Sequence, residues 1–243
     1  MLSNDLKKII SKFKNGIYLE TGFRDGVSAK QAIELGFKKV ISIEIDKDSV
    51  VNGKKEFESE IKNGVLEIIE GDSSECLEKY FNKQVSVVYL DAHGGKEIYP
   101  VPLEKELEIL SKLKLDKNQM IIIDDFYKIK KQQIYDENNW KRQISFENIK
   151  LLIKKFERNF IELPYWSNKK KILFSSRGCN SYYILADKSL YYQWLILKNS
   201  TYVYFLKYLN LSLYVLKEKI FKKILNKKFY NFLKKFFYKN DNK

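Results

Sequence analysis

The sequence predicts an α/β fold: a doubly wound, mostly parallel sheet of seven strands with helices on both faces. Short runs rich in Val and Ile alternate with amphipathic segments over residues 16–125. Within each run the apolar residues are consecutive, which is typical of strands that are buried on both faces. The alternation of such runs with helical segments favours parallel strands joined by crossover helices.

Seven strands and six helices account for this pattern. The expected strands are 16–20, 39–44, 65–69, 85–90, 120–123, 160–165 and 182–186. The expected helices are a short amphipathic one within 1–16, then 28–35, 48–61, 74–81, 103–113 and 146–156, each with apolar residues at helical spacing. Two polar stretches, 136–142 and 168–180, have few apolar residues and are interpreted as loops.

Composition excludes several classes of protein. The chain has 243 residues, of which 44% are hydrophobic and 15% aromatic, so it is not a disordered protein. Two cysteines and a single histidine exclude a disulfide scaffold and a Cys/His zinc cluster. No charge-free run of eighteen apolar residues and no apolar signal core at the N-terminus are present, so we expect a cytoplasmic protein.

Acidic residues follow the first five expected strands. They are Glu20, Glu44, Asp72, Asp91 and the pair Asp124 and Asp125. Parallel strands end at the same edge of a sheet, and open α/β sheets bind ligands at that edge. The sequence therefore predicts a ligand site lined by carboxylates.

The turn after the first strand contains two glycines. Gly22 and Gly26 have the spacing G-x-x-x-G, which differs from the G-x-G-x-x-G of dinucleotide sites and disfavours a nicotinamide cofactor. Glu44 comes 22 residues after Gly22, close to the separation at which an acid meets ribose hydroxyls in nucleotide sites. A nucleoside-containing ligand is therefore expected.

Four segments resemble the class I S-adenosylmethionine-dependent methyltransferases. They are Glu20-x-Gly22-x-x-x-Gly26-x-Ser28, Ser42-Ile-Glu44, Gly71-Asp72-Ser73 and Tyr89-Leu-Asp91-Ala-His93. The variety most similar is the metal-dependent O-methyltransferases that modify macrocin and other sugars. The resemblance implies a Rossmann-like methyltransferase domain over residues 1–197 and O-methylation of a sugar hydroxyl on a glycan or on a nucleotide-linked or lipid-linked sugar.

The resemblance also implies roles for individual residues. The methionine half of the cofactor would lie beside Glu20, Gly22 and Gly26, the ribose on Glu44, and the adenine beside Asp72 and Ser73. Further implied cofactor contacts are Thr21, Ser28, Ile45 and Asp91. In metal-dependent members, acids after strands four and five bind Mg²⁺, and the corresponding residues are Asp91, Asp124 and Asp125. The sequence Asp-Ala-His-Gly-Gly after strand four departs from the sugar-modifying pattern, which has a second acid there.

Each of these residues also has a purely structural interpretation. Asp124 and Asp125 are equally suited to capping the next helix, and Ser28 and Ser73 to beginning one. His93, two residues beyond Asp91, is the best candidate for a general base, with Asp91 as the second catalytic residue, or it is a polar loop residue. A group of aromatic and arginine residues could bind a sugar by stacking and hydrogen bonding: Trp140, Arg142, Tyr165, Trp166 and Arg177. Ordinary packing explains the presence of each of them equally well.

The net charge of +14 is concentrated in the tail, residues 198–243. This segment holds twelve lysines and two acids, which leaves the first 197 residues at +4. The pattern of residues 203–238 predicts a basic amphipathic helix. Such a helix is suited to an anionic membrane surface, which would make the protein peripheral at the inner face of the membrane. It is equally suited to packing on the domain or on a second subunit of a homo-oligomer. Nucleic acid is disfavoured as a partner, because it would leave the apolar stripe unexplained. Two alternatives to a sugar methyltransferase remain, a cofactor-binding adaptor recruited to membrane and an RNA methyltransferase.

Overall fold

The computed structural model describes residues 2–92, 101–113, 115–116, 118–126, 129, 144–156, 158–166 and 179–186. Residues 1–165 and 180–197 belong to one compact unit, whereas residues 166–179 and 198–243 belong to a second, almost all of which lies outside the described residues. The predicted basic tail and its boundary at residue 198 therefore stay predictions, as does the loop 136–142.

The sheet has the strand order β3-β2-β1-β4-β5-β7-β6. The strands are β1 (Ile17–Thr21), β2 (Lys39–Glu44), β3 (Leu66–Glu70), β4 (Val85–Leu90), β5 (Met120–Ile123), β6 (Asn159–Trp166) and β7 (Cys179–Ala186). The pairs β1–β2, β1–β4, β2–β3 and β4–β5 are parallel, and β7 pairs antiparallel with β5. The predicted α/β fold with a mostly parallel sheet is therefore confirmed.

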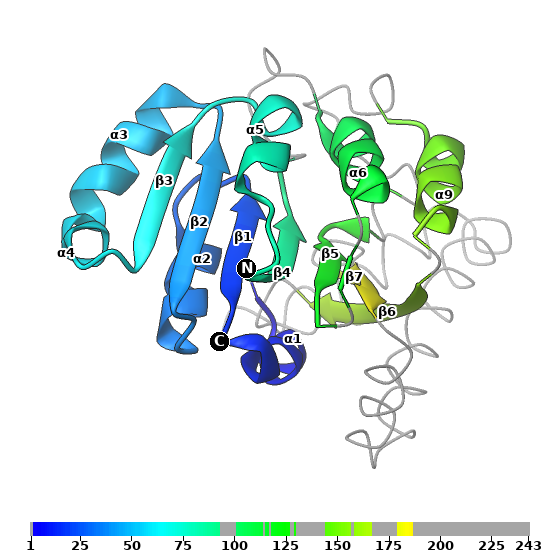
Figure 1. Ribbon diagram of the computed structural model, residues 1–243, viewed down its shortest axis with the longest axis horizontal. Helices are drawn as coiled ribbons and strands as arrows, with labels where there is room; N and C mark the ends of the chain where they lie inside the picture. Colours follow the sequence, from blue (N-terminus) through cyan, green and yellow to red (C-terminus); the bar gives the residue numbers. More distant parts are fainter. Residues whose placement is uncertain are drawn as a thin grey trace, which may run out of the picture. The chain divides into compact units, whose positions relative to one another are not determined.

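Helices cover both faces of this sheet. They are α1 (Asn4–Ile10), α2 (Val27–Glu34), α3 (Lys47–Glu56), α4 (Glu58–Lys62), α5 (Ser73–Tyr80), α6 (Leu103–Lys112) and α9 (Phe146–Lys154), with a 3-10 turn η1 (Ser11–Phe13) after α1. In Figure 1, α2 lies behind the sheet, and α5, α6 and α9 follow one another along the opposite face. Helix α6 packs against both α5 and α9.

A hydrophobic core lies between the sheet and the row α5, α6 and α9. Leu19 of β1, Val88 of β4 and Ile121 of β5 are fully buried there. Leu103, Leu107 and Leu110 of α6 meet them at helical spacing. The apolar stripe of α6 therefore fixes that helix on this face of the sheet, between α5 and α9.

The structure differs from the predicted elements at two places. The single helix expected over 48–61 is divided into α3 and α4 at Phe57, whose φ of −104° and ψ of 29° leave the helical region. Phe57 is buried, and its ring packs edge-on against Phe23 with centroids 5.7 Å apart. The second difference is the predicted loop 168–180, since β7 already begins at Cys179.

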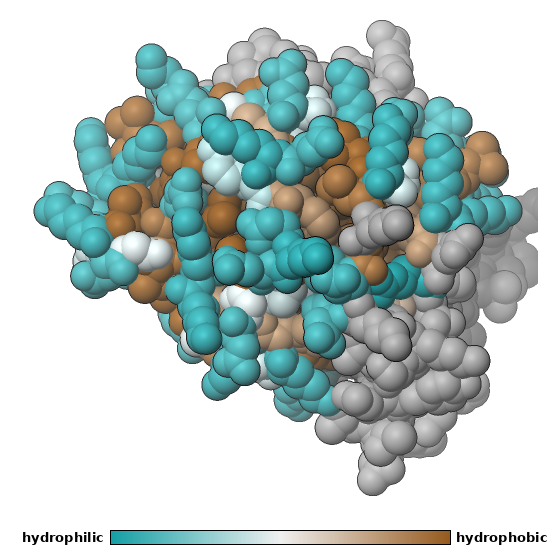
Figure 2. All heavy atoms as spheres, viewed as in Figure 1, coloured by the Kyte–Doolittle hydropathy of each residue, from teal (hydrophilic) through white to brown (hydrophobic). Residues whose placement is uncertain are grey.

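Hydrophilic side chains cover much of the surface in the view of Figure 2. The large apolar side chains that are exposed in the described ranges are Val27, Val51 and Leu151, which belong to three different helices. No helix in the described part of the chain combines the length and the apolar composition that a bilayer span requires.

Candidate active site

The parallel strands bring the predicted acids to one edge of the sheet. Glu20 pairs with Ser42 across β1 and β2, and with Tyr89 across β1 and β4. Asp91 directly follows β4, and Asp124 directly follows β5. The carboxyl ends of four neighbouring strands therefore carry Glu20, Glu44, Asp91 and Asp124, as the sequence predicts.

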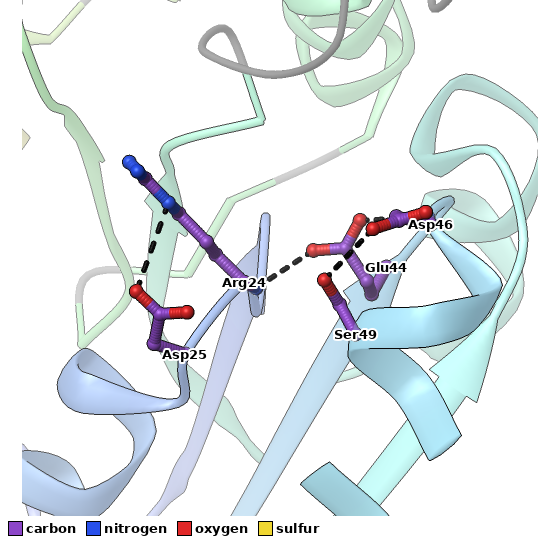
Figure 3. Close-up of polar contacts among 5 residues, drawn as sticks. All are labelled: Arg24, Asp25, Glu44, Asp46 and Ser49. Atoms are coloured by element: carbon purple, nitrogen blue, oxygen red, sulfur yellow. Dashed lines mark hydrogen bonds and ion pairs between the residues drawn. The ribbon is translucent and has the colours of Figure 1, made fainter. Parts of the chain in front are cut away.

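Glu44 is held by main-chain groups on both sides of its carboxylate (Figure 3). The backbone N–H of Arg24 donates a hydrogen bond of 2.7 Å to Oε2, and the backbone N–H of Asp46 donates one of 2.8 Å to Oε1. Glu44 is 8% exposed. Each carboxylate oxygen has two lone pairs, so each retains acceptor capacity after these bonds. The carboxylate is thus oriented in advance and still able to accept hydroxyl donors.

The glycine turn brings the chain close to the end of β4. Gly22 has a φ of +87°, and its N–H donates a hydrogen bond of 2.8 Å to the carbonyl of Ile43. A Cβ at this position would lie 2.7 Å from the carbonyl oxygen of Asp91. Only glycine combines this backbone angle with so close an approach. Gly26, with a φ of +63°, packs equally closely on the ring of Phe23 and precedes α2.

Glu20 is a completely buried carboxyl on the face of β1 that α2 covers. Ser42 donates a hydrogen bond of 2.8 Å to its Oε1, and Ser28 of α2 also faces the carboxyl. Its Oε2 is buried and has no hydrogen-bond partner in the part of the chain that the structure describes. Burial raises the pKa of Glu20 to about 7, against the lowering effect of the two serines. An orphaned buried oxygen of this kind fits a donor supplied by a ligand.

Asp72 and Ser73 stand at the beginning of α5. The Asp72 carboxylate accepts a hydrogen bond of 2.8 Å from the Ser74 N–H, so it caps the helix. Ser73 is 4% exposed. Asp72 therefore has a structural function as well as its predicted place beside adenine.

Thr21 and Ile45 lie next to the two carboxylates. Thr21 alternates with Glu20 along β1, so its completely buried side chain lies on the other face of the strand, the face that α5 and α6 cover. Ile45 follows β2 directly and is half-buried. The cofactor contacts implied for both residues stay predictions.

Asp91, Asp124 and Asp125 lie near one another without forming a set of metal ligands. Among the described residues, no three His, Cys, Asp or Glu side chains are arranged to hold a metal ion. The Asp124 carboxylate accepts hydrogen bonds from the Tyr89 hydroxyl and, at 2.6 Å, from the Asp125 N–H. The arrangement thus departs from the predicted magnesium site, because Asp124 is directed to β4 and to its own turn.

The pKa of the Asp91 carboxyl depends on burial and on the neighbouring carboxylates of Asp124 and Asp125. Burial raises its pKa well above the usual range, and the negative charges of Asp124 and Asp125 raise it further. A carboxylate whose pKa is raised is a stronger base than an ordinary one. Asp91 therefore has the electrostatic setting of a proton acceptor.

Several predicted residues lie where the structure describes no side chain. His93, Trp140, Arg142 and Arg177 lie outside the described residues. Tyr165 and Trp166 belong to β6, which extends one residue beyond the end of the expected strand 160–165. The roles proposed for these six residues stay predictions.

The structure also reveals a buried carboxyl that the sequence analysis missed. Glu106 of α6 is completely buried, and burial raises its pKa to about 7. A glutamate in a helix is usually solvated. The available signal was its position on the apolar stripe, directly before Leu107.

Comparison with solved structures gives the fold class. A Bacillus cereus O-methyltransferase in complex with S-adenosylhomocysteine has a TM-score of 0.54 and 16% identity, over 77% of this chain and 83% of that one. A Streptomyces achromogenes O-methyltransferase of tomaymycin synthesis, in complex with S-adenosylmethionine, has a TM-score of 0.53 and 11% identity over 77% and 82%. A Podospora anserina methyltransferase bound to S-adenosylhomocysteine has a TM-score of 0.52 and 15% identity over 77% and 80%. The chain therefore has the class I methyltransferase fold.

Comparisons of sequence add nothing to this result. No protein-family model matches the chain, and no curated protein matches it either. At these low identities the solved structures establish the fold alone.

Proposed function

We propose that the protein is an S-adenosylmethionine-dependent O-methyltransferase. The observation that carries the proposal is the Glu44 carboxylate, which two main-chain N–H groups fix at 2.7 and 2.8 Å beside the turn of Gly22. A carboxylate oriented in this way suits the two neighbouring hydroxyls of a ribose, because charged acceptors form the stronger hydrogen bonds. The solved O-methyltransferases with the same fold support the assignment.

The other strand ends supply complementary contacts for the same cofactor. The orphaned Oε2 of Glu20 suits an ammonium donor such as that of the methionine half. Gly22 leaves no side chain between the turn after β1 and the end of β4. Asp72 and Ser73, at the beginning of α5, suit the adenine end.

Methyl transfer to a hydroxyl requires the protein to align the acceptor oxygen with the methyl carbon and to provide an acceptor for the hydroxyl proton. When bound, S-adenosylmethionine supplies an electrophilic methyl carbon, which bonds to the acceptor oxygen as the sulfur–carbon bond breaks. Holding the two reactants in line accounts for much of the rate acceleration in such a transfer. Asp91, with its raised pKa, and His93, two residues further, are the proposed acceptors for the hydroxyl proton.

Magnesium is the part of the proposal that the side chains support least. The Asp124 carboxylate is engaged by Tyr89 and by the Asp125 N–H, so Asp91, Asp124 and Asp125 do not fit a ligand set as they lie. No step is therefore assigned to a metal ion. Sensitivity to a chelator would show that the reaction needs a metal ion, and the three carboxylates would then have to rearrange if they bind it.

The acceptor class comes from the sequence resemblance. Similarity to sugar-modifying O-methyltransferases favours the hydroxyl of a glycan or of a nucleotide-linked or lipid-linked sugar. The basic tail, with twelve lysines in residues 198–243, would favour an acceptor near an anionic membrane surface.

Calorimetry on the full chain tests the cofactor site. The wild-type protein should bind S-adenosylhomocysteine and should not bind NAD. Glu44→Gln should weaken the binding of S-adenosylhomocysteine by about tenfold, since a charge-assisted acceptor is lost. Glu67→Gln is the matched control: Glu67 lies on the neighbouring strand β3 and pairs with Lys39 at 2.5 Å, so its substitution should leave the binding unchanged.

Transfer of labelled methyl groups tests the reaction class. Nucleotide-linked sugars, lipid-linked sugars and RNA would be offered in turn, with Mg²⁺ and with EDTA. Label on a sugar oxygen would support the proposal. Cofactor binding with no label on any acceptor would favour an adaptor, and label on RNA would favour an RNA methyltransferase.

A further inference from the structure

The buried face of α6 carries one charged side chain. Leu103, Leu107 and Leu110 form an apolar stripe in which every member is fully buried, and Glu106 is buried beside them. An apolar residue at position 106 would continue the stripe without removing a charge from water. A carboxyl in such a place is costly unless its oxygens are satisfied, so its presence calls for a reason other than packing.

The Glu106 carboxyl faces two hydroxyls that come from separate strand-end turns. Thr21 is the last residue of β1 and directly precedes Gly22, and Ser73 is the first residue of α5 and directly follows Asp72. Both hydroxyls favour the ionised form of Glu106, so both lie close to its oxygens. Asp72 is the neighbouring charged group, and its negative charge acts in the opposite direction.

These groups form a closed polar cluster inside the apolar core. The oxygens of the Glu106 carboxyl and the hydroxyls of Thr21 and Ser73 are buried, and none of these atoms forms a hydrogen bond within the described ranges. Both hydroxyls nevertheless lie near enough to affect the pKa of Glu106, so a trapped water molecule or a small side-chain rotation would join the three groups. Through this cluster, α6 is connected to the turn after β1 and to the turn after β3.

We propose that Glu106 is a positioning residue that holds the turn after β1 and the turn after β3 in register through Thr21 and Ser73, and thereby shapes the cofactor site. The inference rests on the proposed function, because these two turns are the ones assigned to the methionine half and to the adenine of S-adenosylmethionine. Glu106 does not contact the cofactor itself. Its effect is exerted on residues that do.

Two substitutions at position 106 separate positioning from packing. Glu106→Leu extends the apolar stripe and removes the polar contacts, whereas Glu106→Gln keeps a side chain that can bond to both hydroxyls. In calorimetry with S-adenosylhomocysteine, Glu106→Leu should weaken binding by about tenfold relative to wild type. Glu106→Gln should bind more tightly than Glu106→Leu, with an affinity within about threefold of wild type. The melting temperature of Glu106→Leu should be equal to or above that of wild type. A purely structural role would instead lower stability and leave the affinity of the folded protein unchanged.

The matched control is Glu108→Leu on the same helix. Glu108 is exposed and pairs with Lys112 at 3.0 Å, so its substitution should change neither binding nor local exchange. If Glu106→Leu does not fold, Thr21→Val removes one partner hydroxyl at nearly constant volume, and it should weaken binding by about threefold. Wild-type affinity in both Glu106→Leu and Thr21→Val would overturn the inference.

Hydrogen–deuterium exchange distinguishes failure of this inference from failure of the proposed function. In the protein without ligand, Glu106→Leu should accelerate amide exchange in peptides that cover residues 20–26 and 71–76, relative to Glu108→Leu. Accelerated exchange in a protein that binds no S-adenosylhomocysteine would reject the methyltransferase and keep the positioning role. Unchanged exchange in both peptides would reject the positioning role, whatever the ligand.

Discussion

Glu20 and Ser42 meet across two neighbouring parallel strands, where the Ser42 hydroxyl donates a hydrogen bond of 2.8 Å to Glu20 Oε1. Both side chains are completely buried. The bond is a lateral connection between β1 and β2 at the level of the proposed cofactor site. It stabilises the ionised form of Glu20, so it partly opposes the effect of burial on the Glu20 pKa.

Substitution of Ser42 by Ala should therefore destabilise the protein more at high pH than at low pH. Above pH 7 the ionised Glu20 loses a charge-assisted donor, which costs about 2 kcal/mol, whereas the protonated form loses a weaker bond. Urea denaturation at pH 6 and pH 8.5 measures the difference. Ser111→Ala on the exposed side of α6 is the control, and equal destabilisation of Ser42→Ala at both pH values would contradict the prediction.

Glu106 should make the stability of the protein fall as pH rises. Its pKa is about 7 in the folded protein against an ordinary value of 4.5, so the folded state holds a proton that the unfolded state releases. The stabilisation from this proton is complete below pH 4.5 and is lost progressively up to about pH 7, by roughly 3 kcal/mol in all. Glu106→Gln does not titrate. Its stability relative to wild type should therefore increase over that interval, and a constant difference would show that Glu106 titrates normally.

Gly22→Ala should destabilise the protein more than Gly64→Ala does. Both glycines have positive φ, +87° and +73°, so both substitutions incur backbone strain of about 1–2 kcal/mol. A Cβ at Gly64 would have no neighbour within 4 Å, whereas one at Gly22 would lie 2.7 Å from the Asp91 carbonyl oxygen. The excess destabilisation of Gly22→Ala in denaturant measures the close approach of β1 to the end of β4. Equal losses of unfolding free energy in the two variants would mean that the end of β4 shifts to accommodate the Cβ without a cost in stability.

Tyr89→Phe should destabilise the protein by about 2 kcal/mol, because the buried carboxylate of Asp124 loses a hydroxyl donor. Thermal and chemical denaturation above pH 7 give the value. Tyr80→Phe, on the half-buried side of α5, is the control and should stay within about 0.5 kcal/mol of wild type. A neutral Tyr89→Phe would indicate that Asp124 is satisfied by its other neighbours.

Three of the central strands could be predicted to the residue, and β1 to within one residue, since it is Ile17–Thr21 where 16–20 was expected. The bounds of β2, β4 and β5 are those expected, because each is an apolar-rich segment bounded by polar residues. The edge of the sheet that carries the acids was also predictable, since it follows from parallel pairing alone. Local sequence decides these features.

Features that depend on distant contacts could not be predicted. The division between α3 and α4 at Phe57 reflects packing against Phe23, a residue 34 positions earlier. The hydrogen bonds of Asp124 depend on the Tyr89 side chain of a neighbouring strand, which strand-end spacing does not reveal. Glu106 was missed because a helical glutamate is normally solvated, and its burial follows from how α6 packs on α5.

The donors that fix Glu44 come from the main chain, so they do not depend on which side chains stand at positions 24 and 46. Substitutions that keep the local backbone should therefore leave the Glu44 carboxylate oriented, and at position 24, where φ is 50°, these are chiefly glycine, asparagine and aspartate. Proline is the exception at both positions, because it has no N–H to donate. Homologous sequences should accordingly vary at these two sites within the limits of the backbone conformation, with proline missing from both.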